Sequence, residues 1–366
     1  MTSLAFPRLP VLPEAAFRDG ADDAQEIEVA GRTLTPTPVF NTYWRFAAER
    51  QSIYAARLQG RPGPWTQDPI LSSHRFTNCY RAADRVSQYL IRHVVYSGPQ
   101  DFEEVAFRTL LFKIFNRIGT WELLTSELGQ LTWSSYDHDE YDRVLSTAFA
   151  DGRTLYSAAY VMAPPRLGAL RKHTNHLRLL ERMMLSGMAE ALAGARSMYA
   201  AFAALRAQPG IGDFLGFQFL IDLNYSDGLA FDEMEFVVPG PGARDGIRKC
   251  FGKAADGIEA EVIRYMAEHQ DEHFARLGLP FSGLHGRPLQ LIDCQNLFCE
   301  VDKYARVAHP NVPGISGRTR IKQRFAPVSA PLTDWFPPKW GLNPSPIQET
   351  GPWSEPSVGS LLSSAR

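Results

Sequence analysis

The chain has 366 residues, of which 45% are hydrophobic and 21% are charged. This composition is typical of a folded globular protein and excludes a disordered or fibrous chain. The formal net charge of -2 excludes a uniformly basic nucleic-acid binder. Any contact with nucleic acid must therefore come from local basic patches.

The cysteines and the N-terminus indicate the cellular compartment of the protein. The four cysteines lack the spacing of a disulfide framework and favour a reducing compartment; they are Cys79, Cys250, Cys294 and Cys299. Prolines interrupt the first residues where a signal peptide needs an apolar run. No apolar stretch approaches the roughly 20 residues that span a bilayer. We expect no membrane partner and a cytoplasmic location, or a nuclear one in a eukaryote.

Apolar periodicity predicts helices along most of the chain. Residues 1–36 are proline-rich and predicted to be irregular, with a short strand at Glu26–Leu34. Helical spacing begins at Phe40 and ends at Gly60, and a proline-rich loop follows. Further helices are predicted at 78–96, 103–124, Tyr141–Gly152, Thr154–Val161, Leu167–Arg206, Phe214–Leu223, Asp245–Phe251 and Ala255–Leu277.

This pattern predicts a mainly α fold, a compact multi-helix domain with few short strands. One such strand is expected at Met234–Val238. The domain is expected to span 37–325, and its helices to form two lobes at about 37–165 and 166–325. Residues 326–366 are rich in proline and serine and are predicted to form a tail.

The stretch Pro209–Asp213 contains two glycines between helical segments. Gly210 and Gly212 permit a tight turn with positive φ and no Cβ in the way. The helix that begins near Asp213 presents unpaired N–H groups and a positive dipole end, which suits a phosphate oxygen. A plain turn between two helices is the alternative.

The same stretch resembles the helix-hairpin-helix of DNA glycosylases, with its Pro-Gly-Ile-Gly turn. In that superfamily a catalytic aspartate follows the hairpin, and the resemblance puts it at Asp232, with Glu235 as a second acid/base candidate. The lysine of the bifunctional glycosylases falls at Phe214, so the resemblance does not imply Schiff-base lyase chemistry.

Two further glycine-rich loops carry basic residues, at Val238–Gly252 and Asn311–Phe325. From Lys303 to Arg324 there are six Lys or Arg and no carboxylate, a pattern that favours contact with backbone phosphates. A solvated basic helix face is the alternative reading of the first loop. The residues predicted to bind DNA phosphates are Gly210, Gly212, Asp213, Gly242, Arg244, Lys303, Arg306, Arg318 and Lys322.

Several long stretches resemble the helical domain of 5-hydroxymethyluracil DNA kinases, a family also described as DNA base hypermodification proteins. They are Tyr43–Gly60, Pro64–Tyr96, Phe107–Leu124, Pro239–Gly252, Asp293–Arg306 and Pro313–Phe325. The resemblance implies a helical protein acting on modified thymine in DNA. The kinases carry a P-loop, and no GxxxxGK[ST] occurs here. We therefore expect no cofactor, and ATP or another activated donor only with a partner kinase or transferase.

The resembling motifs are rich in polar side chains at helical spacing. A flipped base requires a pocket with an aromatic wall and polar groups for the base edge. The predicted base-pocket residues are Asn78, Arg81, Asp84, Arg85, Trp121, Gln295 and Glu300. The alternative is that Arg81–Asp84 and Glu300–Lys303 are internal salt bridges.

The stretch His269–His273, HQDEH, fits an inverted zinc-peptidase pattern. The stretch reads as an exposed polar helix and no third ligand segment follows, so we predict no metal.

These observations predict a DNA-binding protein of thymine or 5-hydroxymethyluracil hypermodification that flips a modified base into a helical pocket. Its expected partner is DNA, double-stranded and containing modified thymine. Two alternatives stay open. One is a monofunctional helix-hairpin-helix glycosylase, and the other is a non-catalytic DNA-recognition module that serves a separate kinase or transferase.

Overall fold

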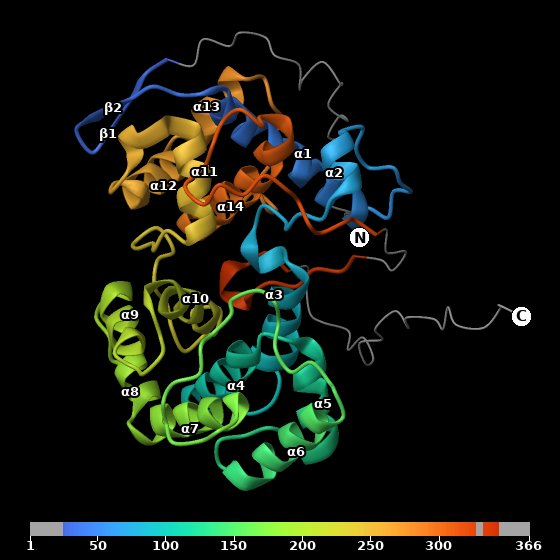
Figure 1. Ribbon diagram of the computed structural model, residues 1–366, viewed down its shortest axis with the longest axis vertical. Helices are drawn as coiled ribbons and strands as arrows, with labels where there is room; N and C mark the ends of the chain where they lie inside the picture. The colour runs from blue at the N-terminus through green and yellow to red at the C-terminus, as the bar shows by residue number, and fades with distance from the viewer. Residues whose placement is uncertain (1–24, 327–331, 344–366) are drawn as a thin grey trace, which may run out of the picture.

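The computed structural model describes residues 25–326 and 332–343, and within them the chain is mainly helical (Figure 1). The prediction of a mainly α fold is confirmed. The predicted irregular segment at 1–24 and the tail residues 327–331 and 344–366 lie outside the described residues. No helix in the described part is long and apolar enough to cross a membrane.

The two strands form a hairpin, β1 (Ile27–Val29) and β2 (Arg32–Leu34), which pair antiparallel with Ile27 opposite Leu34. Ala30 and Gly31 between them have φ of 51° and 71°. Positive φ at both central residues gives the turn a twist that matches the strands. The strand predicted at Glu26–Leu34 is thus a hairpin.

The helices follow in chain order. The first half contains α1 (Pro38–Leu58), α2 (Pro69–Ser73), η2 (Arg81–Ala83), α3 (Arg85–Leu90), η3 (Ile91–Val95), α4 (Phe102–Phe115), α5 (Ile118–Leu128) and α6 (His138–Ala150). The second half contains α7 (Lys172–Leu185), α8 (Met188–Ala193), α9 (Met198–Arg206), α10 (Asp213–Leu223), α11 (Pro241–Phe251), η4 (Gly252–Ala255), α12 (Glu259–Glu268), α13 (Gln270–Arg276), α14 (Leu291–Ala308) and η5 (Pro338–Trp340).

These elements form two lobes (Figure 1). In the upper lobe, as drawn, α14 packs on α1, α2, α11 and α12. In the lower lobe, α4 packs on α5, α7, α8 and α10. The elements η2, α3 and η3 lie where the lobes meet. The helices group differently in space from the expected division near residue 165, because α1 and α2 lie with α11–α14.

The upper lobe is organised around α1. Pro38 occupies its first turn and the Thr37 hydroxyl accepts a hydrogen bond from Val39 N at 3.1 Å, so the helix begins with a filled cap. Tyr43 and Trp44 are fully buried. Trp44 stacks on His273, with ring centroids 5.0 Å apart. The HQDEH stretch therefore contributes a core histidine, because burial against aromatic rings suits a neutral imidazole.

Several helix predictions and one strand prediction were wrong. The stretch 167–206 is broken into α7, α8 and α9, because Gly187 adopts φ of 71° between the first two. Residues 154–161 are not helical, and Tyr160 has φ of 55°. Residues 234–238 form a turn and extended chain instead of a strand.

Part of the predicted C-terminal tail packs into the molecule. In residues 332–343, Phe336 is 1% exposed and stacks on Trp340. Trp340 also meets Tyr225 edge-on, with centroids 5.8 Å apart. This segment therefore belongs to the structured core beside α10.

Candidate functional site

A buried ion-pair triad lies where the lobes meet. Arg81 from η2 and Lys113 from α4 both pair with the carboxylate of Asp222, at the end of α10. The Lys113 Nζ lies 2.7 Å from Asp222 Oδ2, and the Arg81 guanidinium contacts Oδ1. All three side chains are at most 3% exposed. The triad thus joins three elements that are far apart in the sequence.

Aromatic rings enclose the triad. Arg81 donates a hydrogen bond to the Tyr225 hydroxyl at 3.1 Å. Lys113 Nζ lies 4.1 Å from the ring centroid of Tyr160, within cation–π range. Tyr160 stacks in turn on Phe214, with centroids 5.9 Å apart and planes 17° from parallel. Tyr160 is held in the left-handed backbone region, which is uncommon for a residue other than glycine.

The triad holds more positive than negative charge. Burial acts to raise the pKa of Asp222, but the charges of Arg81 and Lys113 outweigh it and hold that pKa below its usual value. Burial lowers the pKa of Lys113 to about 8, although Asp222 partly opposes the shift. Two cations therefore share one carboxylate away from water, and Lys113 is the cation that gives up its proton more easily.

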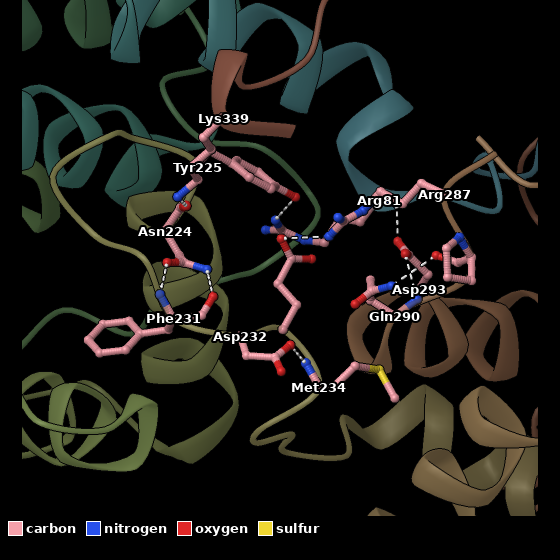
Figure 2. A network of polar contacts seen from close by, with 12 residues as sticks. Arg81, Asn224, Tyr225, Phe231, Asp232, Met234, Arg287, Gln290, Asp293 and Lys339 are labelled. Carbon is pink, nitrogen blue, oxygen red and sulfur yellow. Dashed lines mark hydrogen bonds and ion pairs between the residues drawn. The ribbon is translucent and has the colours of Figure 1, made fainter. Parts of the chain in front are cut away.

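Asp293, in the first turn of α14, lies beside Arg81 of the triad (Figure 2). Its Oδ1 accepts a hydrogen bond from Arg81 N at 2.8 Å, and its Oδ2 accepts one from Gln290 N at 3.1 Å. Burial raises the pKa of Asp293 to about 7, and the nearby Glu233 carboxylate adds to the shift. The start of α14 is thus tied directly to η2 through a carboxyl that titrates near neutral pH.

The loop after α10 is fixed by polar contacts (Figure 2). The Asn224 side chain donates to Phe231 O at 3.0 Å and accepts from Phe231 N at 3.1 Å. Lys339 donates to the carbonyl oxygens of Ser226 and Leu229 at 2.9 and 2.7 Å, and also to that of Asn224. The C-terminal segment thereby holds this loop closed with an ammonium group that binds three of its carbonyl oxygens.

Glu233 and Arg287 form a second ion pair, 3.3 Å apart, at the edge of this loop. Glu233 is 6% exposed, and burial raises its pKa. The Arg287 guanidinium also lies 4.2 Å from the ring centroid of Trp340. This pair links the loop to the chain that precedes α14.

A pair of buried amides connects α10 and α14. Gln218 donates from its amide nitrogen to Gln295 Oε1 at 3.2 Å, and the two residues are 0% and 1% exposed. Gln218 Oε1 is buried and has no hydrogen-bond partner in the described part of the chain. Gln218 lies one turn before Asp222 and therefore on the same face of α10. A buried acceptor without a donor is costly, so Gln218 Oε1 is open to a donor from water or from a ligand.

The two predicted catalytic carboxylates lie on the same loop but at its surface. Asp232 is exposed and accepts from Met234 N at 2.9 Å (Figure 2). Glu235 is exposed and accepts from Met198 N at 2.8 Å, at the start of α9. Both carboxylates thus bind backbone N–H groups, and the buried carboxylate between them is Glu233.

The predicted base-pocket residues are only partly brought together. Arg81 belongs to the triad, and Gln295 belongs to the buried amide pair. Asp84 accepts from Asn78 N at 2.7 Å, and burial raises the pKa of Asp84 to about 7. The Arg81–Asp84 salt bridge, the alternative to a base pocket, is absent from the described structure, because Arg81 pairs with Asp222.

The other predicted pocket residues lie in different surroundings. Arg85 is exposed, and Trp121 is buried against Phe112 in the lower lobe. Glu300 pairs with Lys303 at 2.8 Å and also accepts from Thr77 N at 3.0 Å. The Glu300–Lys303 salt bridge weighed as an alternative is therefore formed.

In the stretch predicted as a helix-hairpin-helix, α9 and α10 are joined by a short turn, and its likeness to the DNA-glycosylase element stays a prediction. α9 packs on α10, and Gly210 in the turn has φ of 80°. Gly212 is exposed and caps α10 without a side chain. Asp213 pairs with Arg206 at the surface. Binding of a phosphate at this turn stays a prediction.

The second predicted phosphate loop is used for packing. A Cβ on Gly242 would lie 2.9 Å from Cys299 Sγ on α14, so this glycine lets two helices approach. Arg244 is exposed and lies 3.6 Å from Glu259. Arg306 is mostly buried and pairs with Asp302, a carboxylate that it shares with Lys249 inside the upper lobe.

The remaining predicted basic residues form an exposed segment. Arg318, Arg320, Lys322 and Arg324 are all exposed. The segment is anchored at one end by Asp245, whose carboxylate accepts from Ser316 N at 2.7 Å. It is anchored at the other end by backbone bonds between 323–325 and 73–75. We name residues 318–324 the basic segment.

Sequence reasoning missed Lys113, Asp222, Tyr160 and Asp293. A signal existed for two of them. Lys113 is the lone cation in the apolar run Leu110–Phe115, and Asp222 is the lone carboxylate in Phe214–Leu223. A single charge in an apolar helix requires a buried partner. Nothing in the sequence states which partner it takes.

No cluster of three or more metal-binding side chains occurs in residues 25–326 and 332–343. The site described above is built from ammonium, guanidinium, carboxyl, amide and phenol groups. These groups bind and orient a polar ligand through hydrogen bonds and charge.

Comparison with known proteins gives two matches. Residues 37–314 match the family described as "5-hmdU DNA kinase, helical domain". The chain is also 25% identical over 293 residues to the 5-hmdU DNA kinase of Bacillus phage SP10, covering 74% of this chain and 45% of that protein. It therefore spans less than half the length of this relative. No solved structure matches. Since the family match covers most of the chain, the protein belongs to the family of the helical domain of 5-hmdU DNA kinases.

Proposed function

We propose that this protein binds DNA containing 5-hydroxymethyluracil and holds the modified base, flipped from the duplex, at the triad between the lobes. The relative's name supplies the base, because that protein is a 5-hmdU DNA kinase. The observation that carries the proposal is the buried excess of positive charge at Arg81, Lys113 and Asp222. The protein would then serve thymine hypermodification by presenting the base for a chemical step.

The groups at the junction suit a uracil ring with a hydroxymethyl arm. Lys113 and Arg81 can donate to the carbonyl oxygens of the ring, and the unpartnered Gln218 Oε1 can accept from its N–H or from the hydroxymethyl group. Tyr160 and Phe214 form a stacked pair beside Lys113, which is the kind of surface on which a flipped base stacks. This combination supports a base site more than a plain structural salt bridge.

Entry of a base requires movement near Tyr160. The triad is closed in this structure, and Tyr160 covers Lys113 from the loop between α6 and α7. Tyr160 is held at φ of 55°, so displacing it relieves an uncommon backbone conformation. Exposed basic groups such as those of the basic segment are expected to hold the DNA backbone meanwhile.

We propose that these residues recognise the base and that a kinase or transferase supplies the donor chemistry. No P-loop motif occurs in these 366 residues, and they span less than half of the kinase relative. A glycosylase role depends on Asp232, and that carboxylate is exposed and bound to a backbone N–H.

The test compares duplexes that differ at one base, 5-hydroxymethyluracil or thymine, with 2-aminopurine as its neighbour. Flipping unstacks 2-aminopurine and raises its fluorescence, so we expect a rise and tighter binding with the modified duplex only. Lys113→Met should abolish both differences, because it removes a donor at the base site. Equal binding and equal fluorescence for both duplexes would rule the proposal out.

The chain supplies a matched control for that variant. Lys249 and Arg306 share the buried Asp302 in the upper lobe, so this group repeats the charges of the triad away from the lobe junction. Lys249→Met should therefore weaken the fold comparably but keep the discrimination between duplexes. Release of free base in the same incubations, followed by mass spectrometry, would instead indicate a glycosylase.

A further inference from the structure

A cavity lies in the upper lobe, apart from the triad. It has a volume of about 800 Å³ and is lined mainly by α1, α2 and the loop that joins them, with Phe325 and Leu332 at its edge. Its basic lining residues are Arg50, Arg57, Arg61 and His74, and no Asp or Glu lines it. A cavity of this size accommodates a ligand as large as a nucleotide.

Arg50 is the buried cation of this cavity. It is 8% exposed, and burial lowers its pKa. Its Nε donates to Thr77 O at 2.9 Å and its Nη2 donates to Asn78 Oδ1 at 2.6 Å, which fixes the plane of the guanidinium. Its Nη1 is buried and has no partner in the described residues. Arg50 is therefore held in place with one donor unused.

Arg57 and Arg61 add two cations from the end of α1 and the loop after it. The Arg57 guanidinium lies 5.3 Å from the ring centroid of Trp65, and burial lowers its pKa. Trp65 donates from its indole to Arg61 O at 2.7 Å, and the Nε of Arg61 is a further buried donor without a partner. Trp65 thus braces both arginines at the cavity.

None of the three arginines forms an ion pair with an acidic residue in the described part of the chain. Clustered guanidinium groups repel one another, and burial makes the repulsion more costly. A phosphate has the negative charge and the several acceptor oxygens that such a cluster can bind, often with two hydrogen bonds per arginine. The unused donors therefore indicate an anionic ligand with phosphate chemistry.

The rest of the cavity wall is apolar. Ile53, Leu71 and Phe76 line it beside the arginines. A bare phosphate ion would leave this surface without a contact, whereas a nucleotide brings a ring and a sugar to cover it. The mixed lining thus favours an organic phosphate over an inorganic one.

The basic segment runs past this cavity. Arg75 N donates to Gln323 O at 3.1 Å and Phe325 N donates to Ser73 O at 3.1 Å, so the end of the segment is bonded beside the cavity residue His74. A strand of nucleic acid lying along the basic segment would bring its nucleotides to the cavity mouth.

We propose that this cavity is a nucleotide-binding site, with the phosphate held by Arg50, Arg57 and Arg61 and the nucleoside packed on the apolar wall. The site is separate from the triad and does not depend on the function proposed for it. Two sources share this chemistry: a free nucleoside monophosphate, and a phosphorylated nucleotide at the end of a DNA strand.

Titration calorimetry with the full chain tests the proposal. The probes are thymidine 5′-monophosphate, thymidine, inorganic phosphate, and a short oligothymidine with and without a 5′-phosphate. We expect at least tenfold tighter binding of the monophosphate than of thymidine or phosphate alone. If only the phosphorylated oligonucleotide binds, the source is a strand end. Failure of every phosphorylated probe, or equal binding of phosphate and monophosphate, would overturn the proposal.

Substitutions of the cavity arginines test whether the nucleotide binds in this cavity. Arg57→Met and Arg61→Met change half-buried side chains at its edge and should each weaken binding at least tenfold. Arg50→Met should also weaken binding at least tenfold. Because Arg50 is buried, the result for this variant counts only if the variant folds. The control is Arg182→Met, an exposed arginine in the last turn of α7, which should leave binding unchanged. Binding that survives both edge variants would also overturn the proposal.

Discussion

Lys113 and Asp222 form a buried ion pair between α4 and α10, with Nζ 2.7 Å from Oδ2, and Arg81 occupies the other carboxylate oxygen. The carboxylate is thus the only anion in a group of three charges. Removing different members of such a group has unequal consequences, because the charge left behind differs.

The first prediction compares two variants of this group. Asp222→Asn leaves two buried cations without an anion and should lower the free energy of unfolding by about 3–5 kcal/mol. Lys113→Met leaves the balanced Arg81–Asp222 pair and should cost less. Chemical denaturation followed by circular dichroism measures both. A larger loss for Lys113→Met would show that charge balance does not govern the stability of the junction.

The second prediction concerns pH. The pKa of Asp293 is raised to about 7, so between about pH 4 and pH 7 the folded protein keeps a proton that the unfolded chain has released. Stability from this group is full below pH 4 and is lost as the pH rises through 7. The slope for one proton is about 1.4 kcal/mol per pH unit.

Asp293→Asn should flatten that slope, measured as the free energy of unfolding at several pH values. The pKa of Asp84 is raised to about 7 by burial, so a residual slope of the same sign is expected to remain. Asp151→Asn is the control, because it shows how removing an exposed carboxylate changes the slope. An unchanged slope in Asp293→Asn would contradict the assignment of a neutral Asp293 in the folded protein.

The sequence predicted the mainly α fold because apolar spacing and helix caps are local. The breaks at Gly187 and at Tyr160 were missed because a positive φ is set by tertiary packing as much as by residue type. Local patterns therefore gave the elements better than their boundaries.

The site was harder to predict because its contacts are long-range. Arg81 was predicted to lie in a polar pocket, but its partner Asp222 is 141 residues away in the chain. Helical spacing favoured Asp84 as the partner of Arg81, because Asp84 lies only three residues further along the chain. Hairpin spacing favoured Asp232, but the buried carboxylate of this loop is its neighbour Glu233. Burial depends on how the loop folds over α10 and the C-terminal segment, and no local pattern encodes that arrangement.

The third prediction concerns Lys339, which holds the loop after α10 through three backbone carbonyl groups. Lys339→Met should leave those carbonyls unpaired and loosen residues 224–231. We expect their amide hydrogen exchange to speed up at least tenfold, measured by mass spectrometry. The exposed Lys253→Met is the control. If exchange changes equally in both variants, the C-terminal segment does not close this loop.

The fourth prediction concerns the contact between α11 and α14. A Cβ on Gly246 would lie 2.1 Å from Phe298 O, a backbone atom that side-chain rotation cannot move. Gly246→Ala must therefore push the helices apart and should cost about 1–3 kcal/mol or more, measured by thermal and chemical denaturation.

Gly119→Ala is the matched control for Gly246→Ala. Gly119 also lies in a helix, α5, but no neighbouring atom lies within 4 Å of its added Cβ. Alanine has the higher helix propensity, so this change should be neutral or stabilise the protein by up to about 1 kcal/mol. Opposite signs for the two variants would attribute the loss at Gly246 to helix approach, because the change in propensity is the same. A harmless Gly246→Ala would mean that α11 and α14 can separate without loss, and that the upper lobe does not depend on their close contact.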